Sequence, residues 1–476
     1  MWPMRRIIAQ ALPAYDDRMP SPPRLLPTRD DLGRLATLAG PVVVAEIGWM
    51  SMGLVDTIMV APLGATAIGS VGLGGILFMG IGIFGMGLLL GLDTFVSQAH
   101  GAGDGVECRR WLGHGLSLAL ILAVPGTLLL AYAARWLPSL GLHPEVLSDT
   151  SAYVGVVNWS LLPLVIYSAF RRYLQGMGVV RPIVVALLSA NLVNVAANWM
   201  LIYGHLGMPR LGVAGAAWAT VISRVYLAVV LGTASWLQAR TLRVALWRSL
   251  GPIEPARLWR LLTLGLPAAS QITLEVGVFA AATALAGRLD PVSLASHQIA
   301  LNVASVVFMV PLGVASASAV LVGQAVGARD GAAAARAGWG ALGSMAVFMI
   351  AVATVFVSVP HWLVGAFTAE ADVVALASRL LLVAAVFQLF DGLQAVATGA
   401  LRGVGDTRTP MLLNLAAHWG LGLPVGYVLC FREGWGVVGL WVGLSVGLIS
   451  VGAALLFVWR RRVRQLSETP DQFRVG

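Results

Sequence analysis

The segment VSQAHGAGD (96–104) returns with few changes as VGQAVGARD (322–330), about 226 residues further along the chain. Pro41 and Pro267 are separated by the same interval. Two further pairs of segments repeat at nearly this displacement: QGMGVVRP (175–182) with RGVGDTRTP (402–410), and LGVAGAAW (211–218) with WGVVGLWV (435–442). A single match among so many glycines and alanines would be chance. Several matches in the same order indicate an internal duplication.

The composition places both copies in a membrane. Hydrophobic residues make up 58% of the 476 residues, charged residues make up 11%, and the mean hydropathy is +0.83. A helix crosses a hydrocarbon core of about 30 Å with about 20 apolar residues. We expect an all-α membrane protein with twelve such spans: 35–60, 67–92, 112–134, 151–170, 183–204, 212–238, 261–287, 293–322, 337–360, 374–400, 411–430 and 437–459.

Each copy holds an even number of spans, so both enter the membrane in the same direction. A pseudo-twofold axis along the membrane normal then relates them, as in alternating-access transporters whose substrate path lies between the halves. We expect five regions: a flexible cytoplasmic leader (1–34), an N-lobe (35–238), an arginine-rich cytoplasmic linker (239–260), a C-lobe (261–459) and a basic cytoplasmic tail (460–476). The leader has no apolar core and does not read as a signal peptide.

The orientation follows from the arginines, which supply all 31 positive charges because the chain has no lysine. Most of them fall in alternate connections, which predicts that both termini are cytoplasmic in an inner or plasma membrane. We expect Arg171, Arg172 and Arg402 in cytoplasmic connections, and Arg224 as the only clearly intramembrane arginine. The net charge of +9 is then explained by topology and anionic lipid, and requires no nucleic-acid partner.

Four carboxyl groups fall inside the predicted spans: Glu46 and Asp56 in the first, Glu275 in the seventh and Asp391 in the tenth. An ionised carboxylate near the bilayer centre costs about 2.5 to 3.5 kcal/mol on insertion scales. Such residues usually face a cavity or a partner, and they are functional candidates by default. The alternative is a neutral acid hydrogen-bonded to a neighbouring helix.

Polar side chains accompany these carboxyl groups at helical spacing. Gln388 and Gln394 lie three residues to either side of Asp391, and Gln271 lies one turn before Glu275. Two more pairs share a helix face: Asn194 with Asn198 in the fifth span, and Gln298 with Asn302 in the eighth. Each pair alone could be ordinary interhelical contact. Together they predict polar linings in both lobes.

These polar linings suggest a chemistry. Taking a carboxyl group out of water favours its neutral form. It can then be neutralised by a proton, a metal cation or a cationic drug, and these ligands compete for one charge. Such competition is the minimum requirement of an antiporter.

Five segments resemble the multidrug and toxic compound extrusion (MATE) transporters, most closely their NorM-like branch. They are MGLVDTIMVAPLG (52–64), NVAANWMLIYG (194–204), LEVGVFAAATALAG (274–287), ASHQIALNVASVVFMVPLG (295–313) and FDGLQAVATGALRGVGDTRTP (390–410). The resemblance implies two lobes of six helices that form a V and export organic cations in exchange for Na⁺ or H⁺. It covers nearly the whole chain after the leader.

Carried over by motif, the resemblance implies roles for particular residues. Asp56 is similar to the family's N-lobe carboxylate, with Asn194 and Asn198 as its companions. Glu275 and Asp391 are similar to the C-lobe cation pair, and would be the place for a Na⁺ ion. Glu46 departs from the family pattern, and both a second protonatable group and a structural carboxyl paired with another helix stay open. Trp49 lies on a face similar to that of Asp56, where it could attract a cation or simply pack.

The expected partners are small cationic or lipophilic molecules and the lipid bilayer, with no cofactor beyond the coupling ion, H⁺ or Na⁺, and with the chain acting as a monomer. A flippase for lipids or lipid-linked oligosaccharides is one alternative, but it would need more buried arginine to meet pyrophosphate. A membrane enzyme is another. The only candidate catalytic residues for an enzyme are His100, His114 and Asp93. They lack the spacing of metal ligands or of a catalytic triad, so we expect no enzymatic activity.

Overall fold

The computed structural model describes residues 27–241 and 251–468. Those ranges hold twelve helical segments that are long and apolar enough to cross a membrane, and no strand. The predicted all-α fold with twelve spans is therefore confirmed.

The N-terminal repeat contains six spans, two of which are interrupted: α2 (Arg29–Val60), α3 (Ala65–Leu88) with α4 (Gly91–Gly101), α5 (Gly105–Ala134), α6 (Pro144–Val157) with α7 (Leu161–Gly176), α8 (Arg181–Tyr203) and α9 (Val213–Thr241). The C-terminal repeat follows the same order: α10 (Pro255–Ala286), α11 (Pro291–Gly327), α12 (Gly331–Ser358), α14 (Ala371–Gly403), α15 (Arg408–Asn414) with a π-helical segment η6 (Leu415–Gly422) and α16 (Leu423–Phe431), and α17 (Gly436–Glu468). The short helix α13 (Pro360–Gly365) and the 3₁₀ turns η1 (Ala61–Leu63), η2 (Leu137–Leu140) and η4 (His205–Gly207) lie in or beside connections, whereas the 3₁₀ turn η3 (Asn158–Ser160) interrupts the fourth span between α6 and α7.

Several helices extend past the apolar runs, and polar residues cap some of them. Thr28 and Asp31 form a capping box at the start of α2, and Asp104 and Asp330 cap α5 and α12. α2 begins within the region expected as leader, α10 begins within the expected linker, and α17 ends within the expected tail. The rest of those regions, 1–26, 242–250 and 469–476, lies outside the described residues.

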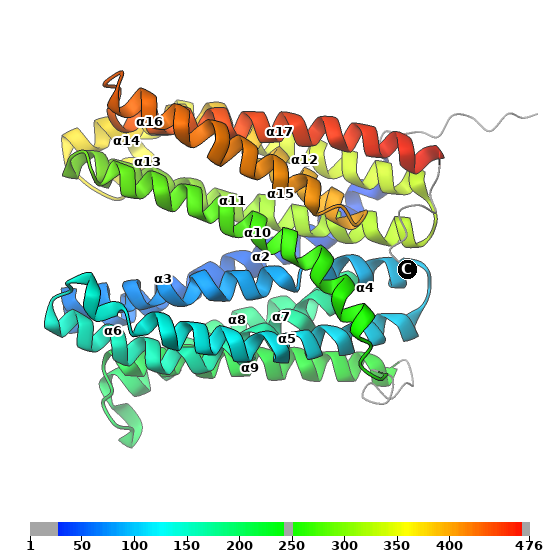
Figure 1. The fold of residues 1–476 in the computed structure, drawn as a ribbon, viewed down its shortest axis with the longest axis horizontal. Helices are drawn as coiled ribbons and strands as arrows, with labels where there is room; N and C mark the ends of the chain where they lie inside the picture. The colour runs from blue at the N-terminus through cyan, green and yellow to red at the C-terminus, as the bar shows by residue number, and fades with distance from the viewer. Residues whose placement is uncertain (1–26, 242–250, 469–476) are drawn as a thin grey trace, which may run out of the picture.

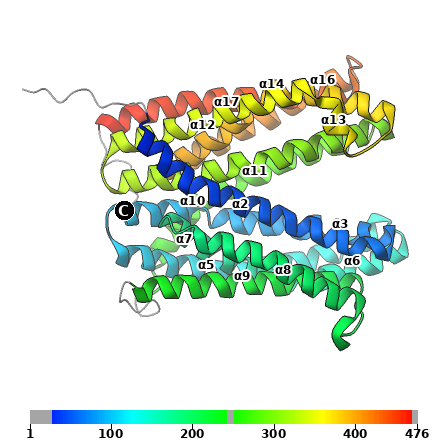
Figure 2. The ribbon, with the colours of Figure 1, turned by 180° about the vertical axis from the view of Figure 1, so that it is seen from behind.

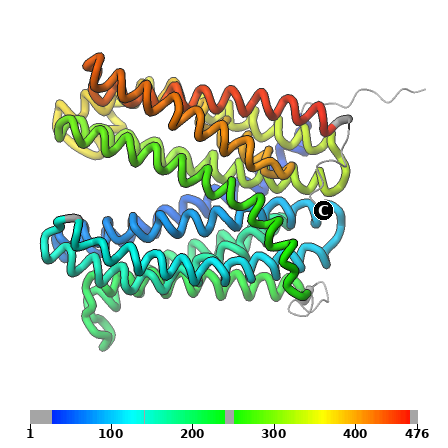
Figure 3. The backbone as a smooth tube through the Cα atoms, in the orientation of Figure 1, coloured from blue at the N-terminus to red at the C-terminus, as the bar shows by residue number. Residues whose placement is uncertain are grey.

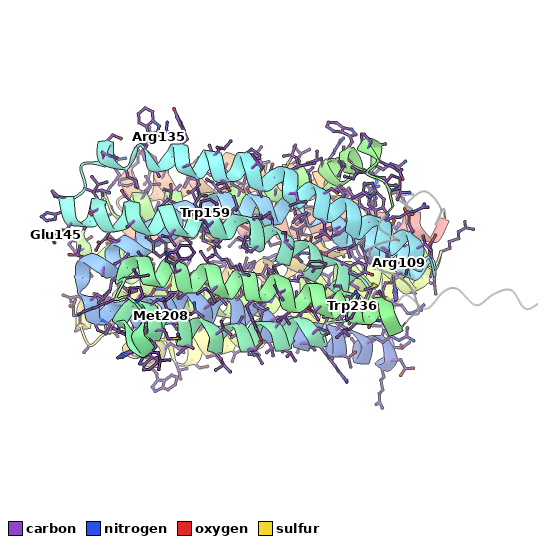
Figure 4. The ribbon with its side chains drawn as sticks, turned by 90° about the horizontal axis from the view of Figure 1, so that it is seen from below. Arg109, Arg135, Glu145, Trp159, Met208 and Trp236 are labelled. Carbon is purple, nitrogen blue, oxygen red and sulfur yellow. The ribbon has the colours of Figure 1, made fainter. Side chains whose placement is uncertain are left out.

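The repeats form two layers of helices that lie close at one end and diverge at the other (Figures 1 and 3). We call the end where α2 begins and α17 ends the terminal end, and the opposite end the distal end. Single spans run the whole distance. Figure 4 shows this for α5, with Arg109 at one end of the molecule and Arg135, next to Glu145, at the other.

The first helix of each repeat crosses from one layer to the other (Figure 2). α2 begins against the C-terminal repeat, where Asp31 pairs with Arg336 at 3.2 Å. α10 begins against the N-terminal repeat, where Arg257 pairs with Glu107. Arg257 also hydrogen-bonds Glu254, the residue before α10, and this lowers the pKa of that carboxyl. Each lobe therefore holds the starting helix of the other.

Glycines allow the two repeats to approach closely where these helices cross. A Cβ atom on Gly265 of α10 would lie 2.0 Å from the carbonyl oxygen of Leu88, at the end of α3. A Cβ atom on Gly313 of α11 would lie 2.8 Å from the backbone nitrogen of Val43 in α2. Backbone fills these positions, so no side chain fits there. The second span is also interrupted beside this crossing, at residues 89–90 between α3 and α4.

Candidate functional site

Asp56 lies inside the N-lobe with a full set of hydrogen-bond donors. One carboxylate oxygen accepts from Asn194 at 2.9 Å and from Asn198 at 2.7 Å, and the other accepts from Thr220 at 2.9 Å. The carboxyl is 6% exposed and both asparagines are fully buried. Three helices, α2, α8 and α9, therefore meet on one carboxylate whose charge is well satisfied.

The C-lobe carboxylates have far fewer partners. Glu275 of α10 accepts a hydrogen bond from Gln394 of α14 at 2.8 Å. Asp391 lies one turn before Gln394 and is 8% exposed, and among the described residues Gln394, which also binds Glu275, is the one side chain that donates to it. Two neighbouring buried carboxylates that share one donor are unstable in their charged forms unless a cation or proton reaches them.

Buried polar groups near this pair also lack partners. Both amide atoms of Gln388 and the amide oxygens of Gln394 and Asn414 are unpaired, and the side chains of Gln388, Asn414 and His418 are fully buried. Asn414 precedes the π-helical segment η6, which Trp419 fixes to α10 through a 3.0 Å hydrogen bond to the carbonyl of Leu274. Single π-helical turns are frequent at functional sites. The sequence-based prediction missed Asn414 and His418, although their four-residue spacing in an apolar span was a usable signal.

Glu46 belongs to a separate group. Its carboxylate pairs with Arg171 of α7, which also hydrogen-bonds Tyr167 at 3.4 Å. Tyr167 stacks on Trp49, with ring centroids 5.8 Å apart and planes inclined by 2°. Trp49 thus packs beside the Glu46 pair, away from the donors that surround Asp56. These contacts fit the structural reading of Glu46 that the sequence had left open.

Arg224 lies in α9 and is buried, but three arginines that the sequence placed in connections lie inside helices as well. Arg171 and Arg172 lie inside α7 and Arg402 inside the last turn of α14, with side chains only 7%, 14% and 11% exposed. Arg172 and Arg402 both approach the fully buried Asp93 of α4, at 3.3 and 3.7 Å. The sequence-based prediction had assigned these arginines to connections. They lie near helix ends, and their long side chains reach from there into the interior of the protein.

The remaining candidates lie outside the buried carboxylate groups or at their edges. Gln271 hydrogen-bonds Thr398 at 3.4 Å, one turn from Glu275 along α10. Gln298 and Asn302 of α11 are exposed and join neither buried group. His114 accepts a hydrogen bond from the backbone N–H of Glu254 at 2.9 Å, whereas Asp93 pairs with arginines. These candidate catalytic residues of a membrane enzyme therefore have separate partners. The described residues contain no group of three or more metal-binding side chains of the His, Cys, Asp and Glu types.

Comparison with known proteins agrees with this architecture. The MatE family model matches residues 41–200 and 267–428, one match in each repeat. The chain is 36% identical over 447 residues to "Probable multidrug resistance protein NorM" of Mesorhizobium japonicum, covering 92% of this chain and 95% of that protein. It is also 36% identical over 438 residues to "Multidrug resistance protein NorM" of Burkholderia vietnamiensis, covering 91% of this chain and 94% of that protein. The chain therefore belongs to the MatE family, as the sequence predicted.

Solved structures show the same fold. "Crystal structure of MATE in the bent conformation" superposes with a TM-score of 0.84 at 22% identity, covering 93% of this chain and 97% of that one. "Outward-facing conformation of a multidrug resistance MATE family transporter of the MOP superfamily" gives 0.81 at 22% identity, covering 92% and 96%. The pairing of two six-span lobes is common to these proteins.

Proposed function

We propose that this protein is a secondary active efflux transporter, which exports cationic or lipophilic drug-like molecules in exchange for H⁺ or Na⁺. It acts as a monomer and alternates between openings at its two ends. The relatives named as multidrug resistance proteins support the class of substrate.

The terminal end faces the cytoplasm of an inner or plasma membrane. It carries arginines near the helix ends, including Arg336 near the start of α12 and Arg462 near the end of α17, and arginines beside the spans are retained on the cytoplasmic side. The two layers of helices diverge at the distal end (Figure 1), which in this orientation faces away from the cytoplasm.

The under-satisfied C-lobe carboxylates carry the proposal. Asp391 and Glu275 are neighbours that share the amide of Gln394 as a donor, so a positive charge is the ligand that both require. Unpaired amide oxygens of Gln394 and Asn414 offer further ligands of the kind that Na⁺ accepts. A proton, Na⁺ or an organic cation can each supply the charge, but binding of one of them weakens binding of the others. One charge moving across 100 mV is worth about 2.3 kcal/mol, enough to drive such an exchange.

Transport by purified protein in liposomes tests this proposal directly. Na⁺ and pH gradients are imposed separately while movement of a fluorescent organic cation is followed. Transport against its gradient with one of the two ions supports antiport and identifies the ion. Transport that ignores both gradients would contradict the proposal.

Lipid flipping is the alternative function, and the arginines that the sequence had placed in connections, Arg171, Arg172 and Arg402, are candidates to bind a pyrophosphate. Each, however, already faces a carboxylate: Arg171 pairs with Glu46, and Arg172 and Arg402 share Asp93. A pyrophosphate would have to displace these carboxylates. Scrambling of a labelled lipid in the same liposomes separates the two functions.

A further inference from the structure

The duplicated segments that reveal the repeat also meet each other across the two lobes. Gln98, in the first copy of the motif, donates from its amide nitrogen to the carbonyl oxygen of Gly403 in the C-lobe at 3.1 Å. Gln324, the matching residue of the second copy, donates to the carbonyl oxygen of Gly176 in the N-lobe at 2.9 Å. The two acceptors are themselves matching residues of the repeat. The pseudo-twofold axis thus relates two reciprocal hydrogen bonds.

The backbones beside these bonds touch. A Cβ atom on Gly101 would lie 1.9 Å from the carbonyl oxygen of Gln324, and a Cβ atom on Gly327 would lie 2.0 Å from that of Gln98. Gly101 and Gly327 are again matching positions. The repeated motif therefore supplies both the small residue that admits the other lobe and the amide that binds it.

A charged contact at the same place lacks this symmetry. Asp93 of α4 is fully buried and faces Arg172 of its own lobe at 3.3 Å and Arg402 of the opposite lobe at 3.7 Å. Thr94 beside it donates to the carbonyl oxygen of Arg402 at 2.7 Å. The repeat places Ala319 opposite Asp93, so the second copy has no corresponding charge.

We propose that Gln98, Gln324, Gly176 and Gly403 form a clasp that closes the terminal end, and that Asp93 locks it through Arg402. The bonds join the lobes, so the lobes separate at this end only when both reciprocal bonds and the Asp93–Arg402 contact break. The clasp thereby sets the population of the state open at the terminal end. This inference rests on the proposed alternation, but on neither the exported compound nor the coupling ion.

A buried cysteine reports how often the clasp opens. Ser97 is fully buried beside Gly323 of the opposite lobe. In a background in which Cys108 and Cys430 are alanine, Ser97→Cys reacts with a water-soluble maleimide only when the lobes separate, so its labelling rate follows the open population. Gln98→Met and Gln324→Met keep the side-chain length and remove the donor. We expect about a fivefold faster rate for each, equal in the two lobes, and about 25-fold for the double variant.

Matched controls separate the clasp from general loosening. Asn191→Leu removes a similar amide bond, 2.8 Å long to the carbonyl of Gly48, that stays within the N-lobe, and it leaves the rate unchanged. Asp93→Asn accelerates labelling more than tenfold, whereas Asp406→Asn, whose partner Arg462 lies within the C-lobe, does not. Rates in the clasp variants equal to the parent's, or matched by those of the controls, overturn the inference. The measurement needs neither substrate nor gradient, so its failure leaves the antiport assay unaffected.

Discussion

The two lobes share one plan of helices but hold their buried carboxylates in opposite ways. In the N-lobe, Asp56 receives three hydrogen bonds from Asn194, Asn198 and Thr220. In the C-lobe, Asp391 has Gln394 alone as a donor within the described residues, and Glu275 shares that same amide. A satisfied carboxylate stabilises the helices that surround it, whereas an under-satisfied one retains affinity for a mobile cation. From this difference we propose coupling for the C-lobe pair and a supporting role for the N-lobe network.

The largest effect expected from this comparison is loss of transport. Glu275→Gln and Asp391→Asn remove the charge that the cation needs, so each should reduce coupled efflux to background. The protein should still insert, because removing the charge relieves its insertion cost. Drug resistance of cells expressing each variant, normalised to the amount of protein in the membrane, measures the effect. Normal drug resistance with either variant would show that the charge of that residue is not required for transport.

A second prediction concerns Glu46, the carboxylate of the N-lobe that forms an ion pair with Arg171. Replacing one member of a buried ion pair leaves the other uncompensated, so Glu46→Gln or Arg171→Gln should lower the free energy of unfolding by about 3 to 5 kcal/mol. The double variant Glu46→Met with Arg171→Met should be more stable than either. Denaturant unfolding in detergent gives these values. If the single variants keep wild-type stability but lose transport, Glu46 is a working group and not a structural one.

The comparison also predicts opposite signs for two similar substitutions. Asp56→Asn removes charge-assisted hydrogen bonds worth about 1.5 to 3 kcal/mol each and should lower the melting temperature. Asp391→Asn removes a buried charge that lies beside the like charge of Glu275 and shares one donor with it, so it should leave that temperature unchanged or raise it. Thermal unfolding of the two purified variants side by side decides the matter. Equal destabilisation by both would show that the two carboxylates are held alike.

The smallest effect is a dependence on pH. Protons and a cationic substrate compete for Asp391, so binding should tighten as pH rises and the proton leaves, by up to tenfold per pH unit. Asp391→Asn should flatten most of this slope, while Asp56→Asn should keep it. Dissociation constants from calorimetry between about pH 6 and pH 9 provide the test. A wild-type slope in Asp391→Asn would mean that its carboxyl does not exchange protons during binding.

The family and the duplicated motifs are evident in the amino-acid sequence. Spans, repeat and family follow from local properties of the chain: apolar length, offset between copies and short motifs. Helical spacing puts Asn194 and Asn198 on one face, and the family resemblance joined that pair to Asp56. Thr220 could not, since nothing in its own span marks the side of α9 that meets α2.

The partners of the charged residues near the helix ends could be identified only from the tertiary structure. The sequence counted Arg171 and Arg402 in connections and used them only for orientation, whereas the fold draws both inward, to Glu46 and to Asp93. In the folded protein Trp49 stacks on Tyr167 and does not join the donors around Asp56. Spacing along one helix fixes which residues share a face. It contains no information on which other helix that face will meet.

The sequence alone determined that this chain crosses the membrane twelve times in two matching copies, because hydrophobic length and internal repetition are properties of the chain itself. Only the tertiary structure decided which carboxylates are satisfied and which glutamines join the lobes. Hydrogen bonds such as that from Gln98 to Gly403 connect residues more than 300 positions apart, and their partners exist only after the helices have packed.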